Sequence, residues 1–247
     1  MISIGVVTPH AEAGPEVELP DMAPGQIVTR LSRVRAAGDG PHPTTPPTSP
    51  SGLRALAAPS ALDAAVGAFA VGSVDAIGYA STSTAYALGS DAEAAMLDRL
   101  SQRWGLPVAG TSASGAAALK ALGVRRVALV HPPWFGRELD GLGAAYFGSQ
   151  GFDVVSAESA DVTHDPACVE TAAVVEWISG NVRNEAEAVF IGGTGFRAAR
   201  AIEALEERLA RPVLESNQVL LWAILARLDA DVAVTGYGRL FGSQPTG

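Results

Sequence analysis

Short apolar segments alternate with longer alanine-rich segments along this chain of 247 residues. A short apolar run is typical of a strand that is buried on both faces, and a longer amphipathic segment is typical of a helix packed beside it. Their alternation favours parallel strands joined by crossover helices. We predict strands at residues 2–8, 74–79, 107–109, 127–130, 153–156, 188–191 and 212–214, and helices at residues 60–71, 91–104, 114–122, 136–150, 166–178, 197–209 and 218–228.

The segment from Gly38 to Gly52 interrupts this alternation because it contains five prolines. Proline fixes φ and lacks a backbone N–H donor, so the segment is predicted to be neither a helix nor a paired strand. A solvated surface loop is the simpler interpretation. The alternative is a flap over an active site that carries His42.

The composition agrees with helices packed on buried strands. Hydrophobic residues make up 48% of the chain and aromatic residues only 6%, so core packing depends mainly on alanine, valine and leucine. The length allows either one large domain or two lobes of about 100 residues each.

The net charge of −9 and the lack of any run of lysine or arginine limit the partners. They argue against nucleic acid and against an anionic membrane surface. The expected ligand is therefore a small molecule, and an anionic ligand must be held by backbone donors or a few side chains.

The N-terminal residues enter a predicted strand directly, without a basic targeting region, and no apolar stretch approaches the ~20 residues that span a bilayer. The single cysteine, Cys168, excludes an intramolecular disulfide and a thiolate metal site, in agreement with a reducing compartment. We therefore expect a cytoplasmic protein. The sequence leaves open whether the chain forms a homo-oligomer.

Two turns of small residues occur at matched places in the two halves of the chain. Each follows a predicted strand and leads towards a helix, at residues 79–83 and 191–195. Backbone N–H groups at such turns bind carboxylates or phosphates. Simple helix capping explains a single turn of this kind equally well, but a matched pair facing one cleft favours a small-anion site. The predicted donors are Ser81, Thr82 and Ser83 on one side and Gly193, Thr194 and Gly195 on the other.

The glycine-rich second turn is not a dinucleotide fingerprint. That motif requires G-x-G-x-x-G beside the first strand, whereas the segment from Gly193 to Ala198 lacks the last glycine and comes late in the chain. The sequence also contains no P-loop, no H-E-x-x-H zinc motif and no G-x-S-x-G elbow. Phosphoryl transfer, zinc-dependent hydrolysis and α/β-hydrolase chemistry therefore have no support.

Histidines are the candidate bases. His10 and His131 each directly follow a predicted strand, where the active sites of α/β proteins gather. His164 is expected at the surface or as a helix cap, and the histidines do not show the spacing of metal ligands. Cys168 falls inside a predicted helix, and we interpret it as a buried small hydrophobe or an exposed bystander.

Several motifs resemble one enzyme family. Residues 122–129 (LGVRRVAL), residues 236–241 (GYGRLF) and the pair Thr82-Ser83 are similar to arylmalonate decarboxylase, and residues 4–9 (IGVVTP) are similar both to it and to maleate isomerase. The similarity runs over nearly the whole chain and is weak between Ala11 and Gly52. The chain thus resembles the arylmalonate decarboxylase and maleate isomerase branch of the aspartate/glutamate racemase superfamily.

The resemblance implies an α/β fold of two lobes related by a pseudo-twofold axis, each a parallel sheet flanked by helices. Residues 1–105 plus 215–247 would form the first lobe and residues 106–214 the second. It also implies a substrate carboxylate held between the lobes by donors of both turns, with no metal and no organic cofactor. The implied substrate-binding residues are Pro9, Thr82, Ser83, Trp134, Gly193, Thr194, Gly195 and Ser216.

The chain departs from the family at the residues that transfer protons. Racemases and maleate isomerases carry a cysteine in each turn, and arylmalonate decarboxylase keeps the second, whereas the matching positions here are Ser81 and Gly193. A glycine cannot protonate a carbanion, so the two-thiol mechanism is excluded and the one-thiol mechanism lacks its thiol. We expect His10 to transfer the proton, with Ser81 as a nucleophile or hydrogen-bond donor and His131 in reserve.

The predicted function is therefore that of a cofactor-independent isomerase or decarboxylase-type lyase, acting on a carboxylic acid through an enolate-like intermediate. Two alternatives stay open. One is a non-catalytic carboxylate-binding relative that has lost the thiols. The other is hydrolysis or hydration by a water held between His10 and Ser81.

Overall fold

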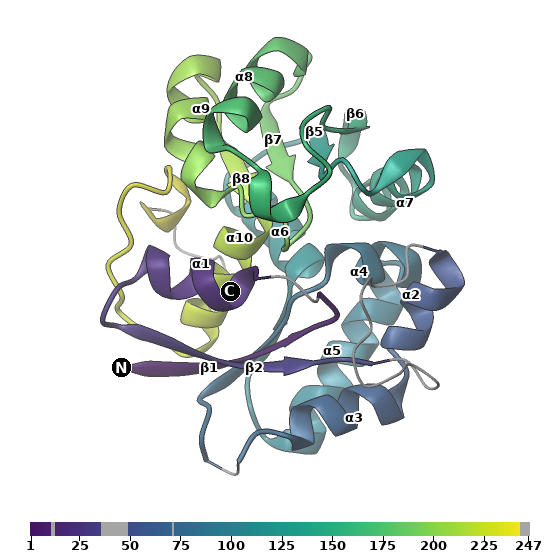
Figure 1. Ribbon diagram of the computed structural model, residues 1–247, viewed down its shortest axis with the longest axis vertical. Coiled ribbons are helices and arrows are strands. Elements are labelled where there is room, and N and C mark those ends of the chain that lie inside the picture. Colours follow the sequence, from purple (N-terminus) through teal and green to yellow (C-terminus); the bar gives the residue numbers. More distant parts are fainter. Residues whose placement is uncertain (11–12, 36–48, 71, 243–247) are drawn as a thin grey trace.

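The computed structural model describes residues 1–10, 13–35, 49–70 and 72–242, and it contains two four-stranded parallel sheets (Figure 1). Each sheet forms the centre of one lobe, with helices packed against it. This confirms the predicted α/β fold of two lobes. Among the described residues, no helix is long and apolar enough to cross a membrane.

The first sheet has the strand order β2-β1-β3-β4, and each neighbouring pair is parallel. Its strands β1 and β3 are almost entirely buried, as expected for strands covered on both faces. The elements of this part of the chain are β1 (Ile2–Thr8), α1 (Pro15–Met22), β2 (Ile27–Arg33), α2 (Pro50–Leu56), α3 (Pro59–Gly67), β3 (Ala76–Tyr79), α4 (Thr82–Leu88), α5 (Ser90–Trp104) and β4 (Val108–Gly110).

The second sheet repeats this plan with the order β6-β5-β7-β8. Its strands point their carboxyl ends towards the first lobe (Figure 1). The elements are β5 (Arg126–His131), α7 (Gly136–Ser149), β6 (Asp153–Ser159), the 3₁₀ turn η1 (Pro166–Cys168), α8 (Thr171–Asn181), β7 (Ala188–Ile191), the 3₁₀ turn η2 (Ala199–Ala201), α9 (Ile202–Leu209) and β8 (Val213–Glu215).

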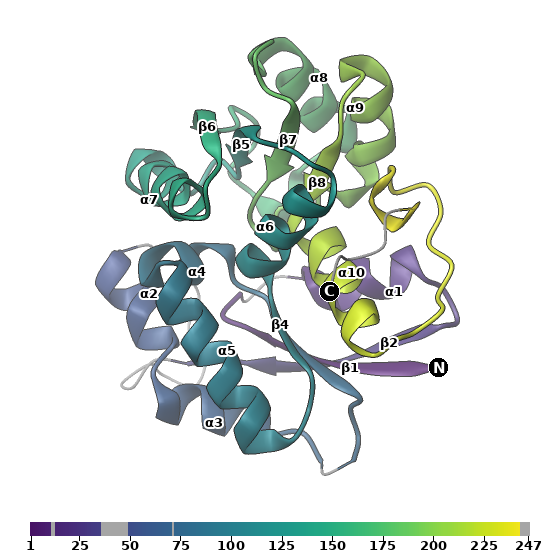
Figure 2. The same cartoon turned by 180° about the vertical axis from the view of Figure 1, so that it is seen from behind.

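Two helices connect the lobes and pack against each other between them (Figure 2). Helix α6 (Thr111–Ala121) follows β4, and helix α10 (Ser216–Arg227) follows β8, before the last 3₁₀ turn η3 (Leu240–Gly242). Glycines allow these two helices to pack closely on the sheets. A β-carbon at Gly115 of α6 would lie 2.6 Å from Phe190 of β7, and one at Gly78 of β3 would lie 3.2 Å from Ile224 of α10. The interlobe core is therefore closely packed.

The predicted strands and most of the predicted helices are confirmed, with boundary shifts of a few residues. The prediction of a loop from Gly38 to Gly52 is wrong at its end, because α2 begins at Pro50. Proline suits the first helical position, and the Ser49 hydroxyl accepts a hydrogen bond from the Gly52 N–H at 3.3 Å. Residues 36–48, including His42, lie outside the described residues.

Two predicted helices begin later than expected. Residues 166–178 divide into η1 and α8, because Val169 and Glu170 have extended backbones. Residues 197–209 instead begin with the 3₁₀ turn η2, which continues directly into α9. The helices α1, α2 and α4 and the strand β2 were not predicted.

Candidate functional site

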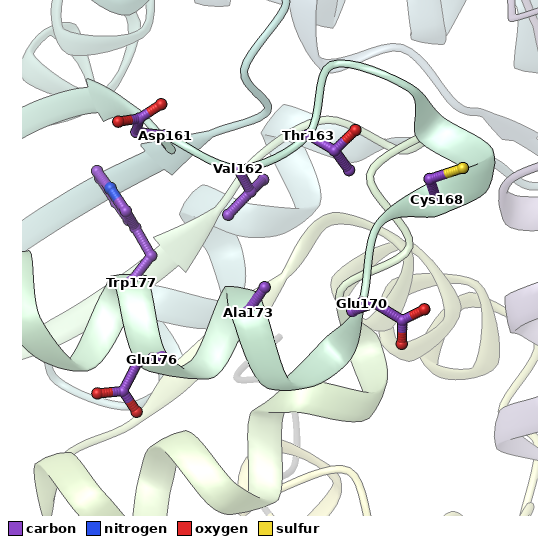
Figure 3. A pocket seen from close by; sticks show the side chains of 8 residues that line it. All are labelled: Asp161, Val162, Thr163, Cys168, Glu170, Ala173, Glu176 and Trp177. Atoms are coloured by element: carbon purple, nitrogen blue, oxygen red, sulfur yellow. The ribbon is translucent and has the colours of Figure 1, made fainter.

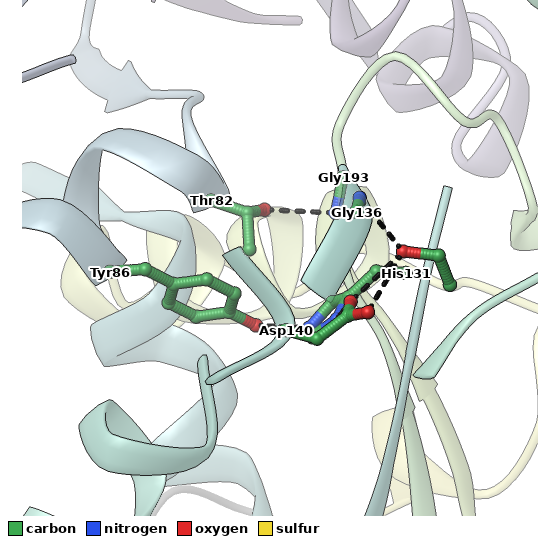
Figure 4. A network of polar contacts seen from close by, with 7 residues as sticks. Thr82, Tyr86, His131, Gly136, Asp140 and Gly193 are labelled. Carbon is green, nitrogen blue, oxygen red and sulfur yellow. Dashed lines mark hydrogen bonds and ion pairs between the residues drawn. The ribbon is translucent and has the colours of Figure 1, made fainter. Parts of the chain in front are cut away.

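The two turns of small residues meet between the lobes. The Gly193 N–H donates to the Thr82 hydroxyl oxygen at 3.1 Å (Figure 4). The Thr194 hydroxyl donates to the Ala80 carbonyl at 3.3 Å. Thr82 and Thr194 are buried. The turn that follows β3 and the turn that follows β7 therefore form one continuous site.

Ser81 serves the local structure of the first turn. It is the N-cap of α4: its hydroxyl oxygen accepts from the Thr84 N–H at 3.4 Å, and its hydroxyl donates to the Thr84 Oγ1 at 2.8 Å. The side chain is fully buried. The Ser81 hydroxyl thus both donates and accepts a hydrogen bond at the start of α4. Ser83, the residue after Thr82, is also buried.

The second turn depends on glycine. Gly193 has a φ of +89°, a conformation that favours glycine. A β-carbon at this position would lie 2.7 Å from the ring of Pro132, and one at Gly195 would lie 3.4 Å from the His10 Nδ1 atom. The turn therefore passes between Pro132, which follows β5, and the imidazole of His10, which follows β1.

His10 lies at this junction, against Gly195. It is partly buried, and Pro9 before it is buried. Burial and the neighbouring Arg33 guanidinium lower the pKa of His10 to about 4, so the imidazole is neutral at pH 7. Arg33, at the end of β2, donates to the His10 carbonyl and lies 3.5 Å from a Glu16 carboxylate oxygen.

Trp134 and Ser216 make different contacts. The Trp134 ring packs edge-on against Phe196, with centroids 6.0 Å apart. Ser216 begins α10, and its hydroxyl donates to a Glu215 carboxylate oxygen at 2.9 Å. Trp134 thus packs against the residue after the second turn, whereas the hydroxyl of Ser216 is bound at the start of α10.

A buried carboxyl group that the sequence analysis missed holds the second turn from behind. The Asn217 amide donates to the Thr194 carbonyl at 2.9 Å and to Glu18 at 2.6 Å. The other oxygen of Glu18 accepts from the Ala199 N–H at 3.1 Å. Burial raises the pKa of Glu18 to about 7. Glu18 lies in α1, which the sequence did not predict, and so gave no local signal of this contact.

His131 lies deeper than expected. Its side chain is fully buried, with the Nδ1 atom 2.7 Å from Asp140 and the Nε2 atom 3.1 Å from the Tyr86 hydroxyl (Figure 4). Phe135 stacks on the ring at a centroid distance of 5.4 Å. Both ring nitrogens of His131 are therefore occupied by Asp140 and Tyr86.

Cys168 lies outside both turns. It is exposed in η1 and borders a surface groove of about 480 Å³ on the second lobe (Figure 3). Its thiol donates to Asp165 at 3.3 Å, and this hydrogen bond raises the pKa of the thiol. His164 is also exposed. Within the described residues, no group of three histidine, cysteine or carboxylate side chains is arranged to hold a metal ion.

Known proteins share this arrangement. Residues 58–241 match the family model of arylmalonate decarboxylase. A maleate cis-trans isomerase from Nocardia farcinica, solved as a mutant with a covalently bound succinylcysteine intermediate, has a TM-score of 0.83 at 23% identity, with 97% of this chain and 98% of that chain covered. No curated protein sequence matches the chain.

Two further structures are similar. A maleate isomerase from Pseudomonas putida with maleate has a TM-score of 0.83 at 21% identity, with 98% of each chain covered. A double mutant of arylmalonate decarboxylase in its liganded form has a TM-score of 0.80 at 22% identity, with 98% of this chain and 99% of that chain covered.

Two α/β lobes, each built on a four-stranded parallel sheet, make up the fold that the chain shares with maleate isomerase and arylmalonate decarboxylase. The chain belongs to the arylmalonate decarboxylase family, because the family model matches most of its length. The family and the fold together point to an enzyme of the isomerase or decarboxylase type.

Proposed function

We propose that this chain catalyses a cofactor-independent isomerisation or decarboxylation of a small carboxylic acid, with His10 transferring the proton. The observation that carries the proposal is the position of a neutral imidazole against Gly195, beside two turns whose polar groups are buried together. A proton acceptor and donors for a developing negative charge are thus adjacent, as enolate chemistry requires.

Thr82 is the best-prepared donor for that charge. Its hydroxyl oxygen already accepts from the Gly193 N–H, so its proton is free to point towards a ligand. Ser83 is buried beside it. A hydrogen bond from such a buried hydroxyl stabilises an oxyanion more than the same bond in water, because the surroundings are less polar.

The surroundings of His10 favour an anionic substrate. Burial and the nearby Arg33 keep the pKa of His10 low in the free protein, and a substrate carboxylate between His10 and Arg33 would raise that pKa towards neutrality. During isomerisation, the imidazole would take the α-proton while the C–H electron pair moves into an enolate. The imidazolium would then return the proton to carbon.

Decarboxylation uses the same groups in a different order. The bond from the α-carbon to the carboxylate breaks, carbon dioxide leaves, and the electron pair remains as the enolate. A protonated His10 then delivers its proton to the α-carbon, and solvent protonates His10 again. Thr82 would hold the enolate oxygen in both reactions.

Binding without turnover is the second candidate function. It is favoured by the hydrogen bonding of the two turns to each other and by the position of the single cysteine outside them. Hydrolysis through Ser81 is less well supported, because its hydroxyl caps α4 and donates to Thr84.

Proton NMR in deuterium oxide tests the proposal. The purified protein is mixed with arylmalonates, maleate, other small dicarboxylates and α,β-unsaturated acids. We expect deuterium incorporation, isomerisation or loss of carbon dioxide with at least one acid. His10→Ala should lower the rate by at least about 100-fold, the usual contribution of a positioned base.

His164→Ala is the matched control, because it removes an exposed histidine outside the site. It should turn over substrate at the wild-type rate. Turnover that persists in His10→Ala would refute the role of His10. Line broadening or shifts of the ligand signals without any turnover would instead support the binding function.

A further inference from the structure

A buried row of three polar side chains crosses from one lobe to the other. Asp140 lies on α7, His131 at the end of β5 and Tyr86 on α4 (Figure 4). The His131 Nδ1 atom is 2.7 Å from Asp140, and its Nε2 atom is 3.1 Å from the Tyr86 hydroxyl. At most 7% of each of these residues is exposed, so water hardly competes for their hydrogen bonds.

The hydrogen bonds assign a direction to the row. The tautomer of His131 that donates its Nδ1–H to the Asp140 carboxylate leaves the Nε2 atom to accept from the Tyr86 hydroxyl. Ser159 donates to both Asp140 oxygens, at 3.0 and 3.1 Å, and so fixes the carboxylate. Burial raises the pKa of Tyr86 well above its usual value, which keeps the phenol a donor.

Two glycines enclose the imidazole and the phenol. A β-carbon at Gly143 of α7 would lie 2.7 Å from the Tyr86 ring and 3.0 Å from the His131 ring. One at Gly192 would lie 2.8 Å from the His131 ring and 3.2 Å from the Tyr86 hydroxyl oxygen. The Tyr86 and His131 side chains therefore cannot shift towards these glycines without moving α7 or the second turn.

The row lies directly behind the contact between the two turns. Tyr86 is one helical turn after Thr82 on α4, so both face the second lobe. Gly192 contacts the row and precedes Gly193, whose N–H donates to Thr82. A β-carbon at Gly192 would also lie 3.3 Å from the Thr82 methyl group. The three side chains of the row thus determine how Gly193 approaches Thr82.

From this geometry we infer that Tyr86, His131 and Asp140 are positioning residues that hold the Gly193 N–H against Thr82 across the lobe boundary. They touch neither a substrate nor the reacting atoms. Their effect on the position of the turns follows from the contacts alone. Their effect on catalysis rests on the proposed function, because only then does Thr82 stabilise a developing charge.

Two conservative variants test the inference. Tyr86→Phe removes the hydroxyl and keeps the ring contacts with Tyr146 and Phe147. Asp140→Asn keeps the shape but replaces one of the two acceptor oxygens by an NH₂ donor, which weakens the acceptor that fixes the His131 proton on Nδ1. Ser90→Ala is the matched control, because the Ser90 hydroxyl also bridges to α7, 3.0 Å from the Ser149 hydroxyl, but it contacts neither turn.

The first readout is hydrogen exchange of the Gly193 amide, followed by NMR, which requires no substrate. We expect exchange at least about tenfold faster in Tyr86→Phe and Asp140→Asn, unchanged exchange in Ser90→Ala, and unchanged protection of the β1 amides in all three. The ¹⁵N shifts of His131 should show Nδ1 protonated in the wild type and an altered state in Asp140→Asn.

The second readout is turnover of any acid that the wild type converts. We expect kcat to fall about tenfold in the two variants with KM within about twofold, because a misplaced donor weakens the transition state more than substrate binding. Wild-type Gly193 exchange in both variants would overturn the inference. Faster exchange with a wild type that converts no acid would support the positioning role and count against the proposed function alone.

Discussion

Replacing Glu93 by glutamine should make the protein more stable relative to the wild type as the pH rises. Between pH 4.5 and pH 8, the difference in the free energy of unfolding should change by roughly 3 kcal/mol in favour of the variant. Glu93 is fully buried in α5, and burial raises its pKa from 4.5 to about 7. The Tyr146 hydroxyl donates to one carboxylate oxygen, and this contact and the Ala113 backbone N–H lower the pKa less than burial raises it. Each pKa unit corresponds to about 1.4 kcal/mol, so a difference of about 2.5 units gives the expected shift.

The direction follows from proton binding. Below pH 4.5 Glu93 is protonated in both the folded and the unfolded state, so the wild type loses nothing. Between pH 4.5 and 7 the unfolded chain releases the proton more readily than the folded protein does, and the wild type loses stability as the pH rises. Glutamine cannot titrate, so the variant does not share this loss.

Denaturant unfolding of both proteins at intervals from pH 4.5 to 8 measures the effect. The difference between the two is informative because other groups also titrate: burial raises the pKa of Glu18 in the same direction, and His10 acts in the opposite direction. Glu207→Gln, at an exposed position of α9, controls for the lost negative charge. A constant difference between wild type and Glu93→Gln over this range would contradict the buried-carboxyl account.

The sequence contained a signal for Glu93 that is clear once the structure is known. Met96, Leu97 and Leu100 form the buried stripe of α5, and Glu93 occupies the preceding position of the same 3.6-residue period. A carboxylate on an apolar stripe is expected to be buried with a partner. That the partner is Tyr146 of the other lobe depends on the packing of α5 against α7, which no local pattern encodes.

Strand β2 and helix α4 were not predicted from the sequence for similar physical reasons. Strand β2 lies at the edge of its sheet and carries exposed Arg30 and Leu31, so it lacks the continuous apolar run of a central strand. Helix α4 begins with Thr82 and Ser83, which are weak helix formers, and is buried on nearly all sides. Packing, and not intrinsic preference, makes it helical.

The candidate site was predictable in part. Parallel strands bring their carboxyl ends to one edge, which placed the two turns together and His10 beside them. The same rule suggested His131, but its imidazole is turned towards α7 and Tyr86. Asp140 is nine residues from His131 in sequence and Tyr86 is 45 residues away, so only the folded chain reveals the row.

Replacing Gly193 by alanine should destabilise the protein by about 4 kcal/mol. The backbone there has a φ of +89°, which costs a residue with a side chain about 1–3 kcal/mol. The new β-carbon would also lie 2.7 Å from the buried ring of Pro132, and such overpacking costs about 1–3 kcal/mol more. A cysteine at this position would meet the same two obstacles, so restoring a thiol here requires the segment after β5 to move.

Gly105→Ala separates the two contributions. Gly105 ends α5 with a φ of +64°, and a β-carbon there would meet no atom within 4 Å. It should therefore cost only the backbone strain, about 1–2 kcal/mol. Chemical unfolding of both variants gives the comparison. If both variants lose the same free energy of unfolding, Pro132 moves aside at little cost and a thiol could be accommodated at position 193. A larger loss for Gly193→Ala would mean that the second turn and the segment after β5 are fixed against each other, in a form that excludes the thiol.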